Sequence, residues 1–508
     1  MSILPDSPST PATFAQIDQL PPEVLAAIFA HLSKQESSLP RHDISYFVQD
    51  LVSVTHVCRF WRQAAINAPG LWTEIKMTNL EAVKVFLERS GAVPLDVQLR
   101  SANKDLIQAV APHSHRFRQF SVSVLPEPHN PFASFTNSAP LLERLEIDYC
   151  PLAQQPFLFN DQTPRLRELV IVTRGLWLQN RLGSLTSLHL TLSNAILSHS
   201  DLLPFFDMLH RCPGLEELFI LWGGLQMASV VPAQLSEVPL HRLKKLLLRS
   251  FRIENIKLLL HIFDLRANGI AIHLSDVHPG HVGGSSLPTI QTVFPNDSRG
   301  RPSLTPCTQL ELIFHTRPRT LIVHALGPGF SIRIDTRLDD RVRIDKVNFM
   351  FYKVFPSVKE LWVRGSPRLN TKLEGFEHFP ALEKLVLNGR GSNLAGNARQ
   401  ALSPDPTLGR LSCPLLSAIH LYGNVSEVRE IFLLVCTRFS AGRQLEKLRV
   451  PSHFLPLPAR VDARVQDVES LDPPSGSLHT HSMELPEFFA KGHKWWIPWK
   501  SRLDQGTF

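Results

Sequence analysis

A spaced pattern of apolar residues recurs along most of this chain. It reads Pro-x-Leu-x-x-Leu-x-Leu, with Ile or Val replacing Leu at some positions. Successive side chains of a strand point to opposite faces, so the last two apolar positions share one face of a short strand. The pair inside each Leu-x-x-Leu is mostly charged, as in Glu143-Arg144 and Lys244-Lys245, which favours a solvent-exposed turn. The copies lie at residues 140–147, 164–171, 185–190, 213–220, 243–248, 356–363, 380–387, 414–421 and 445–450.

The repeated pattern predicts an α/β fold built from stacked units. One unit cannot bury its apolar strand face, whereas stacked units share a continuous core between a parallel sheet and outer helices. The spacing of neighbouring copies is irregular but overlaps the roughly 20–29 residues of leucine-rich repeats. We therefore predict a leucine-rich-repeat-like solenoid over residues 77–450, with a Gly-, Pro-, Ser- and His-rich loop insertion near residues 275–305. The alternative is an ordinary α/β domain whose strands happen to look alike.

Helical periodicity precedes the repeats. Pro21 and Pro22 suit the first turn of an initial helix, and Asp50 suits the N-cap of a second. A short third helix is expected over Arg62–Asn67. These segments predict a three-helix module at residues 17–76, after a Pro-, Ser- and Thr-rich tail at residues 1–16 that we expect to be disordered. The apolar positions with helical spacing are Val24, Leu25, Ile28, Phe29 and Leu32 in the first helix and Leu51, Val54, Val57, Cys58 and Trp61 in the second.

The composition is that of a folded protein without a strong charge signature. Apolar residues make up 43% of the 508 residues, and the net charge of +7 is mild for this length. No long Lys/Arg run accompanies it, so we expect no nucleic-acid partner. The six cysteines are far apart and form no CxxC pair, which favours buried thiols in a reducing compartment. The sequence shows neither a signal peptide nor an apolar run of ~20 residues, so we expect a cytoplasmic or nuclear protein without a membrane span.

Two motifs in the helical module occur in a specific order. The first is Leu20-Pro21-Pro22-Glu23-Val24-Leu25, and the second is Val57-Cys58-Arg59-Phe60-Trp61-Arg62. Together they resemble an F-box, and an F-box followed by degenerate leucine-rich repeats resembles the large F-box families of mushroom-forming fungi. The sequence departs from the usual F-box where extra residues, Ser33–Gln49, separate the first two helices.

This resemblance implies a role in assembling other proteins. F-box proteins bind the Skp adaptor and through it join a cullin-RING ubiquitin ligase, while a second domain holds a target protein. One alternative for the whole chain is a repeat-based scaffold outside any ligase. The alternative for each residue of the helical module is that it only packs the three helices against one another. Carried over by position, the adaptor-binding residues would be Leu20, Pro21, Pro22, Val24, Leu25, Ile28, Leu51, Val54, Val57, Cys58 and Trp61.

The face of the sheet opposite the leucines is the expected surface for a target protein. Repeat solenoids commonly bind partners there, and aromatic residues with Arg often dominate binding energy. The predicted target-binding residues are Phe219, Trp362, Arg364 and Tyr422; the alternative is that loops or the C-terminal tail cover them. Residues 451–508 form a Pro-rich segment and an aromatic tail. Its tryptophans, Trp495, Trp496 and Trp499, are expected to pack on the end of the solenoid.

Catalytic and metal-binding motifs are not found in the sequence. His273, His278 and His281 stand near Asp276 in the Gly/Pro-rich stretch, but their spacing matches no recognised ligand set, so we expect polar loop residues. No nucleophile motif or phosphate-binding loop is present. We therefore expect no cofactor, no metal and no enzymatic activity; the alternative is an enzyme on an unrecognised α/β fold.

Overall fold

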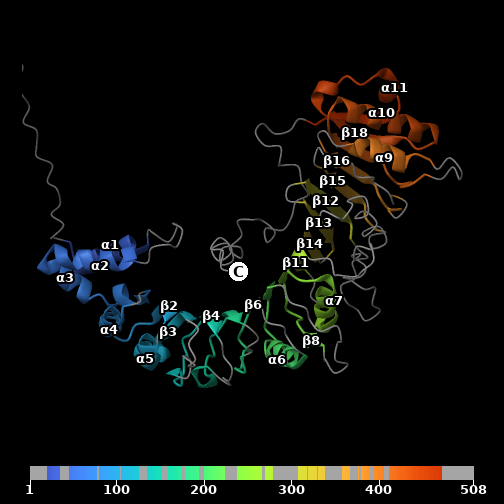
Figure 1. Cartoon of the computed structure of the whole chain (residues 1–508). Coiled ribbons are helices and arrows are strands. Elements are labelled where there is room, and N and C mark those ends of the chain that lie inside the picture. Colours follow the sequence, from blue (N-terminus) through green and yellow to red (C-terminus); the bar gives the residue numbers. More distant parts are fainter. Residues whose placement is uncertain are drawn as a thin grey trace, which may run out of the picture. The chain divides into compact units, whose positions relative to one another are not determined.

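A computed structural model gives the chain's fold in two compact units, each described here by itself (Figure 1). Unit 1 comprises Met1–Arg167 with Leu178–Arg181, and unit 2 comprises Glu168–Trp177 with Leu182–Phe508. The structure describes residues 20–34, 45–76, 79–102, 104–124, 134–150, 158–173, 178–193, 199–223, 237–265, 269–277, 307–316, 319–328, 330–337, 357–365, 376, 379–389, 393–404 and 411–471. The expected N-terminal disordered tail and the C-terminal tryptophans lie outside these residues.

Unit 1 begins with a helical module. Its helices are α1 (Pro22–Lys34), α2 (Ser45–Val57) and α3 (Arg59–Ile66), followed by the 3-10 turn η3 (Pro69–Trp72). Pro22 opens α1, where its missing N–H costs nothing. Two predicted boundaries are wrong. Helix α2 begins at Ser45 rather than after Asp50, and α3 begins at Arg59, so Trp61 belongs to the third helix. The reason is Cys58, which caps α3 by accepting a bond from the Trp61 N–H at 3.4 Å.

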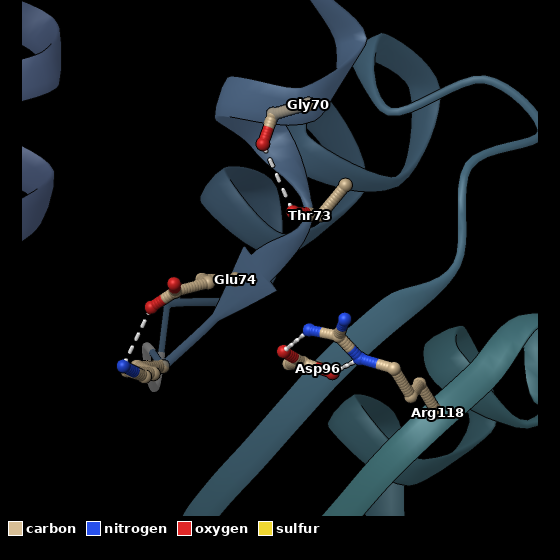
Figure 2. A network of polar contacts seen from close by, with 6 residues as sticks. Gly70, Thr73, Glu74, Asp96 and Arg118 are labelled. Carbon is tan, nitrogen blue, oxygen red and sulfur yellow. Dashed lines mark hydrogen bonds and ion pairs between the residues drawn. The ribbon is translucent and has the colours of Figure 1, made fainter. Parts of the chain in front are cut away.

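A buried tryptophan joins this module to the first strands. The Trp72 indole donates to the carbonyl of Ala65 at 2.8 Å, and its ring meets Phe86 of α4 (Leu80–Arg89) edge-on at 5.0 Å. Next comes β1 (Glu74–Ile75), which pairs in parallel with β2 (Leu95–Ala102). Figure 2 shows the polar side of this junction, where Lys76 pairs with Glu74 and Arg118 with Asp96.

The rest of unit 1 continues the parallel sheet. Its strands follow the order β1, β2, β3 (Phe117–Val124) and β4 (Arg144–Cys150), and α5 (Lys104–Val110) with the 3-10 turn η4 (Ala111–Arg116) connects β2 to β3. A second 3-10 turn, η6 (Phe159–Asp161), follows. Four buried rings with centroids 5.0–6.5 Å apart form the core beneath β3 and η6: Phe117, Phe120, Phe135 and Phe159.

Unit 2 is a large, mostly parallel sheet with helices. Its strands in spatial order are β5 (Glu168–Thr173), β6 (Ser187–Ser193), β7 (Glu217–Gly223), β9 (Lys245–Arg249), β11 (Ile270–Val277), β14 (Phe330–Arg337), β13 (Arg319–Gly327), β12 (Gln309–Thr316), β15 (Glu360–Arg364), β16 (Lys384–Asn388), β17 (Ala418–Tyr422), β18 (Leu445–Val450) and β19 (Val465–Ser470). Of these strands, β13 alone runs antiparallel to its neighbours.

Helices and short elements complete unit 2. The helices are α6 (His199–His210), α7 (Ile253–Ile262), α9 (Leu394–Leu402), α10 (Val425–Ser440) and α11 (Ala459–Asp462), with the 3-10 turn η10 (Ser452–Phe454). A separate two-stranded pair joins β8 (Val238–Pro239) to β10 (Phe263–Asp264). Each described copy of the sequence pattern ends in a strand, and strands such as β6, β7 and β9 place Leu188, Leu218 and Leu246 in register, all fully buried.

The predicted loop near residues 275–305 needs correction at its start. Strand β11 continues to Val277, and His273 is a fully buried strand residue rather than a polar loop residue. Residues 278–306 lie outside the described part of the chain. The sequence pattern is interrupted here because Ile272, Ile332 and Ala325 replace leucine in one buried row, and because β13 runs antiparallel to its neighbours.

A buried arginine ties α10 to the turn before β17. Arg438 is fully buried, and its guanidinium donates to the carbonyls of Ser412 and Cys413 at 3.2 and 3.0 Å. Cys413 has a φ of 50°, a left-handed conformation that is unfavourable for a residue with a side chain. The two bonds therefore hold a strained turn in place, and burial lowers the pKa of Arg438.

We predict that Arg438→Met lowers the unfolding free energy by about 2–3 kcal/mol, because two carbonyls lose a charged donor. Chemical denaturation of the full chain measures this change. Arg429→Met is the matched control, since Arg429 is an exposed residue of the same helix and its loss should cost less than about 0.5 kcal/mol. Equal effects of the two substitutions would contradict the role given to Arg438.

Candidate functional site

Helix α1 carries two apolar stripes instead of one. Leu25 and Phe29, four residues apart, are 1% and 2% exposed and face α2 and α3. Val24 and Ile28 are also four residues apart, yet they are 43% and 42% exposed. A helix that only packs on its neighbours needs one apolar stripe. The second stripe is therefore surface that this module leaves in water.

Further exposed apolar side chains belong to the same module. Val57 at the end of α2 is 60% exposed, and Val52 and Phe60 are exposed as well. Five of the twelve large apolar residues that are exposed in the described part of the chain thus fall in this short module. Val52 and Phe60 were not among the predicted adaptor-binding residues. Phe60 stands inside the second motif, and only the start of α3 at Arg59 reveals that it points outward.

The other predicted adaptor-binding residues have different environments. Pro21 and Pro22 are exposed, Leu20, Cys58 and Trp61 are half-buried, and the Trp61 ring packs on Phe29 at 5.2 Å. Leu25, Leu51 and Val54 are buried in the core of the module. They hold the three helices together and support the exposed stripe from beneath. Because they are buried, they offer no accessible surface to a partner.

Comparison with known proteins bears on this module. Residues 17–78 match the F-box-like family model. No curated protein matches the chain. The F-box-like domain covers α1, α2, α3, η3 and β1, so both motifs and the exposed apolar stripe fall inside it. Such a domain indicates a role in protein–protein interaction.

The face of the unit 2 sheet opposite the leucine rows carries the remaining candidates. Strand pairing aligns one row of this face in register, and the row changes character along the sheet. From β5 to β9 it is apolar and aromatic, and from β11 onward it is mostly polar. In order the row reads Val170, His189, Phe219, Leu247, His273, Arg333, His324, Glu311, Trp362, Val386, His420, Arg449 and Glu469.

The prediction that Phe219 is an exposed target-binding residue is wrong. Its side chain is fully buried and stacks on His189 with ring centroids 4.6 Å apart. The strand alternation that placed Phe219 opposite the leucines was correct. What the alternation did not reveal is that this face is also shielded from water at β7.

The three other predicted residues stay partly exposed on β15 and β17. The Trp362 indole donates to Glu360 at 2.7 Å, and the Lys384 amine lies 5.4 Å from the Trp362 ring centre. Arg364 donates to Glu311 at 3.3 Å, and burial raises the pKa of Tyr422. Strand pairing aligns Arg364 with Tyr422 across β16. Trp362, Arg364 and Tyr422 are therefore partly exposed on the same face of the sheet, and their role in target binding stays a prediction.

Next to this region lie buried ionisable groups on β11 to β15. Glu311 is fully buried and accepts bonds from His324 at 2.8 Å and from Arg364. Asp335 pairs with His273 at 3.1 Å and Arg333 at 2.9 Å. Burial alone would raise the pKa of Asp335, but its bonds to His273 and Arg333 lower it to about 2. Charges buried in this way are stable only when paired, so the groups hold β11 to β15 in one arrangement.

Membrane-spanning helices and metal-binding clusters are both absent from the described residues. No helix in the part of the chain that the structure describes is both long enough and apolar enough to cross a membrane. In the same residues, no group of three or more His, Cys, Asp or Glu side chains could hold a metal ion. Free thiols are found at Cys58, Cys212, Cys307, Cys413 and Cys436, and burial raises the pKa of Cys212 and Cys307 to about 12, so both stay protonated.

We predict that acid destabilises unit 2 through His420. Burial, together with the nearby Lys384 and Arg449, lowers the pKa of His420 to about 4, against about 6.5 in an unfolded chain. The stability contributed by its neutral form is complete above pH ~6.5 and is lost as the pH falls toward 4. In His420→Gln, the denaturation midpoint should therefore fall less between pH 7 and pH 4.5 than in the wild type.

His453→Gln is the control for this measurement, because His453 is exposed on η10. It should retain the acid dependence of the wild type. An unchanged acid dependence in His420→Gln would rule out His420 as its source.

Proposed function

We propose that this chain is the substrate-recognition subunit of an SCF-type cullin-RING ubiquitin ligase. In this proposal the F-box-like domain docks a Skp-type adaptor, and the sheet of unit 2 holds a target protein. The observation that carries it is the second apolar stripe of α1, Val24 and Ile28, which lies in the segment that matches the F-box-like family. Apolar area left in water on a small module is better explained by a partner than by its own core.

The energetics of docking agree with this role. Complete burial of a Val or Ile side chain contributes about 1.5–3 kcal/mol, and covering the roughly half that Val24, Ile28 and Val57 expose contributes about 1 kcal/mol each. Val24, Ile28 and Val57 would together supply a large part of the affinity of a specific complex, with Phe60 as an aromatic contact. The packed residues below, Leu25 and Phe29, keep the exposed stripe rigid, which limits the entropy lost on binding.

The stacked strands are proposed to form a degenerate leucine-rich-repeat-like solenoid. In-register leucine rows and helices between successive parallel strands support this interpretation, as does the spacing of the sequence copies. The likeness to fungal F-box families stays a prediction. In the proposed assembly the accessible region around Trp362, Arg364 and Tyr422 contacts the target protein, since aromatic and Arg side chains dominate many interfaces.

No catalytic role is proposed for this chain. The ubiquitin-charged enzyme of such a ligase does the chemistry, and the contribution of a receptor is to hold the target close to it. A non-ligase scaffold is the competing proposal. It is favoured by the extra segment between the end of α1 at Lys34 and the start of α2 at Ser45, which the usual F-box does not have.

We predict that Val24→Asp with Ile28→Asp abolishes co-purification of a Skp-type adaptor. Each substitution removes an apolar contact worth about 1 kcal/mol and puts a carboxylate that must lose its water into the interface, so affinity should fall at least about 100-fold. Binding of purified adaptor to the full chain, measured by calorimetry, tests this. The melting curve should not change, because both side chains are exposed.

Val425→Asp with Leu433→Asp is the matched control, since these residues of α10 are at least as exposed and lie outside the F-box-like domain. It should bind the adaptor like the wild type. A wild-type chain that does not bind the adaptor would favour the scaffold.

We further predict that Trp362→Ser with Tyr422→Ser reduces target capture at least tenfold while leaving adaptor binding intact. Quantitative proximity labelling in cells, compared with the wild type, provides the measurement. Loss of adaptor binding in this variant would indicate misfolding, and an unchanged set of labelled proteins would remove the target surface from β15 and β17.

A further inference from the structure

Three neighbouring strands of unit 2 carry positive charges and no carboxylate on the sheet face opposite the leucine rows. They are β16, β17 and β18, and we name this part of the face the cationic strip. Strand pairing gives the strip Lys384, Val386, Asn388, Ala418, His420, Tyr422, Lys447 and Arg449. Carboxylates on this face return on the flanking strands, with Glu360 on β15 and with Asp467 and Glu469 on β19.

The acids that pair with the three cations lie on the outer sides of the strip. Lys384 pairs with Glu360 of β15 at 2.5 Å. Lys447 and Arg449 both pair with Glu469 of β19. All three cationic side chains nevertheless remain about one-third exposed. A negative group arriving over the central strand, β17, would therefore meet positive charge from both sides without displacing these acids.

At the centre of the strip, His420 is buried without a hydrogen-bond partner among the described residues. It is 6% exposed, and its surroundings act on it through burial and through charge at a distance. Burial and the three cations of the strip lower its pKa to about 4, whereas Glu360 acts in the opposite direction. Other buried histidines of this face bond to a carboxylate, as His273 does to Asp335. Because buried polar groups nearly always have a partner, the unpartnered imidazole points to a ligand.

A small residue separates the two lysines of the strip. Ala418 pairs in register with Lys384 on one side and with Lys447 on the other. Strands are ~4.8 Å apart, so the backbones that carry the two lysines are about 10 Å apart. Ala418 also stands two residues before His420, on the same side of β17. Its methyl group cannot pair with either lysine, so the place between them has no negative group of its own.

We propose that the cationic strip binds an acidic segment of the target protein, with a carboxylate held between Lys384 and Lys447 and bonded to a ring N–H of His420. The proposal rests on the target-binding role given above, and it names the class of target as a chain with clustered Asp or Glu residues. Bonds between cations and carboxylates are roughly twice as strong as neutral ones. Trp362, whose ring centre lies 5.4 Å from the Lys384 amine, and Tyr422 offer apolar area to the rest of the segment.

The arrangement of charges favours a peptide over a nucleic acid. Nucleic acids bind through many successive phosphate contacts along a continuous basic surface. The strip is only three strands wide, and Glu360, Asp467 and Glu469 border it on both sides. A polyanion that extends past the strip would meet like charges there, whereas one or two carboxylates of a peptide would not.

Histidine NMR on the full chain tests the proposal, since His420 reports any negative charge placed beside it. The probe is a blocked hexaaspartate peptide, and hexaasparagine is its neutral control. At about pH 5, a pKa of about 4 leaves roughly a tenth of His420 protonated. Saturating hexaaspartate should raise that fraction at least about threefold, because a nearby carboxylate favours the charged ring. The His420 signal is the one that is lost in His420→Gln.

Lysine variants provide an independent measurement by calorimetry. Lys384→Gln with Lys447→Gln should weaken hexaaspartate binding at least about tenfold, because both flanking charges are lost. Lys384→Arg with Lys447→Arg keeps both charges and should bind within about threefold of the wild type. The matched control is Lys244→Gln with Lys359→Gln, which should bind like the wild type. These two lysines also pair with glutamates, but they lie in the turns before β9 and β15.

Several results would overturn the proposal. They are no binding of hexaaspartate, equal binding of hexaasparagine, an unchanged protonated fraction of His420, or equal affinity of the glutamine variant and the wild type. Tighter binding of a single-stranded oligonucleotide than of hexaaspartate would overturn it as well. Adaptor binding through α1 is measured on the same preparations. Its failure alone would contradict the ligase role and leave the acidic-peptide site standing, whereas failure of peptide binding alone would contradict the site.

Discussion

The structure depends on the burial of leucine rows that no single strand could bury. Each copy of the sequence pattern places two apolar side chains on one face of a strand about five residues long, and one such strand has no stability by itself. Parallel pairing in register aligns Leu188, Leu218 and Leu246 into a continuous row, and the next row repeats with Leu190, Ile220 and Leu248. The other face of the same strands carries no leucine row, and its residues change from apolar and aromatic at β5 to β9 to mostly polar from β11 onward.

Much of the fold was predictable because the leucine pattern is local. Spacing alone predicted the strands that contain Leu190, Leu387 and Leu421, and the parallel sheet followed because one unit cannot bury its apolar face. The stretch from β11 to β14 was missed for a physical reason. Isoleucine, valine and alanine replace leucine at several positions of the buried rows there, and β13 is antiparallel, so neither the residue type nor the spacing repeats regularly.

The candidate sites were predictable to different degrees. Exposure of Val24 and Ile28 agrees with the motif that contains them, but their separation from Leu25 and Phe29 requires the helix phase and the positions of α2 and α3. Phe219 shows the limit of alternation. Alternation along a strand assigns a side chain to one face of the sheet, but it does not say whether that face is exposed to water. Trp362 and Arg364 obey the same rule and remain partly exposed.

The sheet face opposite the leucine rows changes from apolar to mostly polar at β11, and paired ionisable groups occupy it from β11 to β15. Glu311 has no access to water, so its charge must be matched inside the protein, and strands β13 and β15 bring His324 and Arg364 to it. Removing one partner would leave an uncompensated buried charge, which costs more than the pair contributes. These contacts therefore hold β11 to β15 together. This part of the sheet lies between the apolar residues of β5 to β9 and the partly exposed aromatic and cationic residues of β15 and β17. The paired groups therefore stabilise the part of the sheet where one strand, β13, runs against the direction of the others.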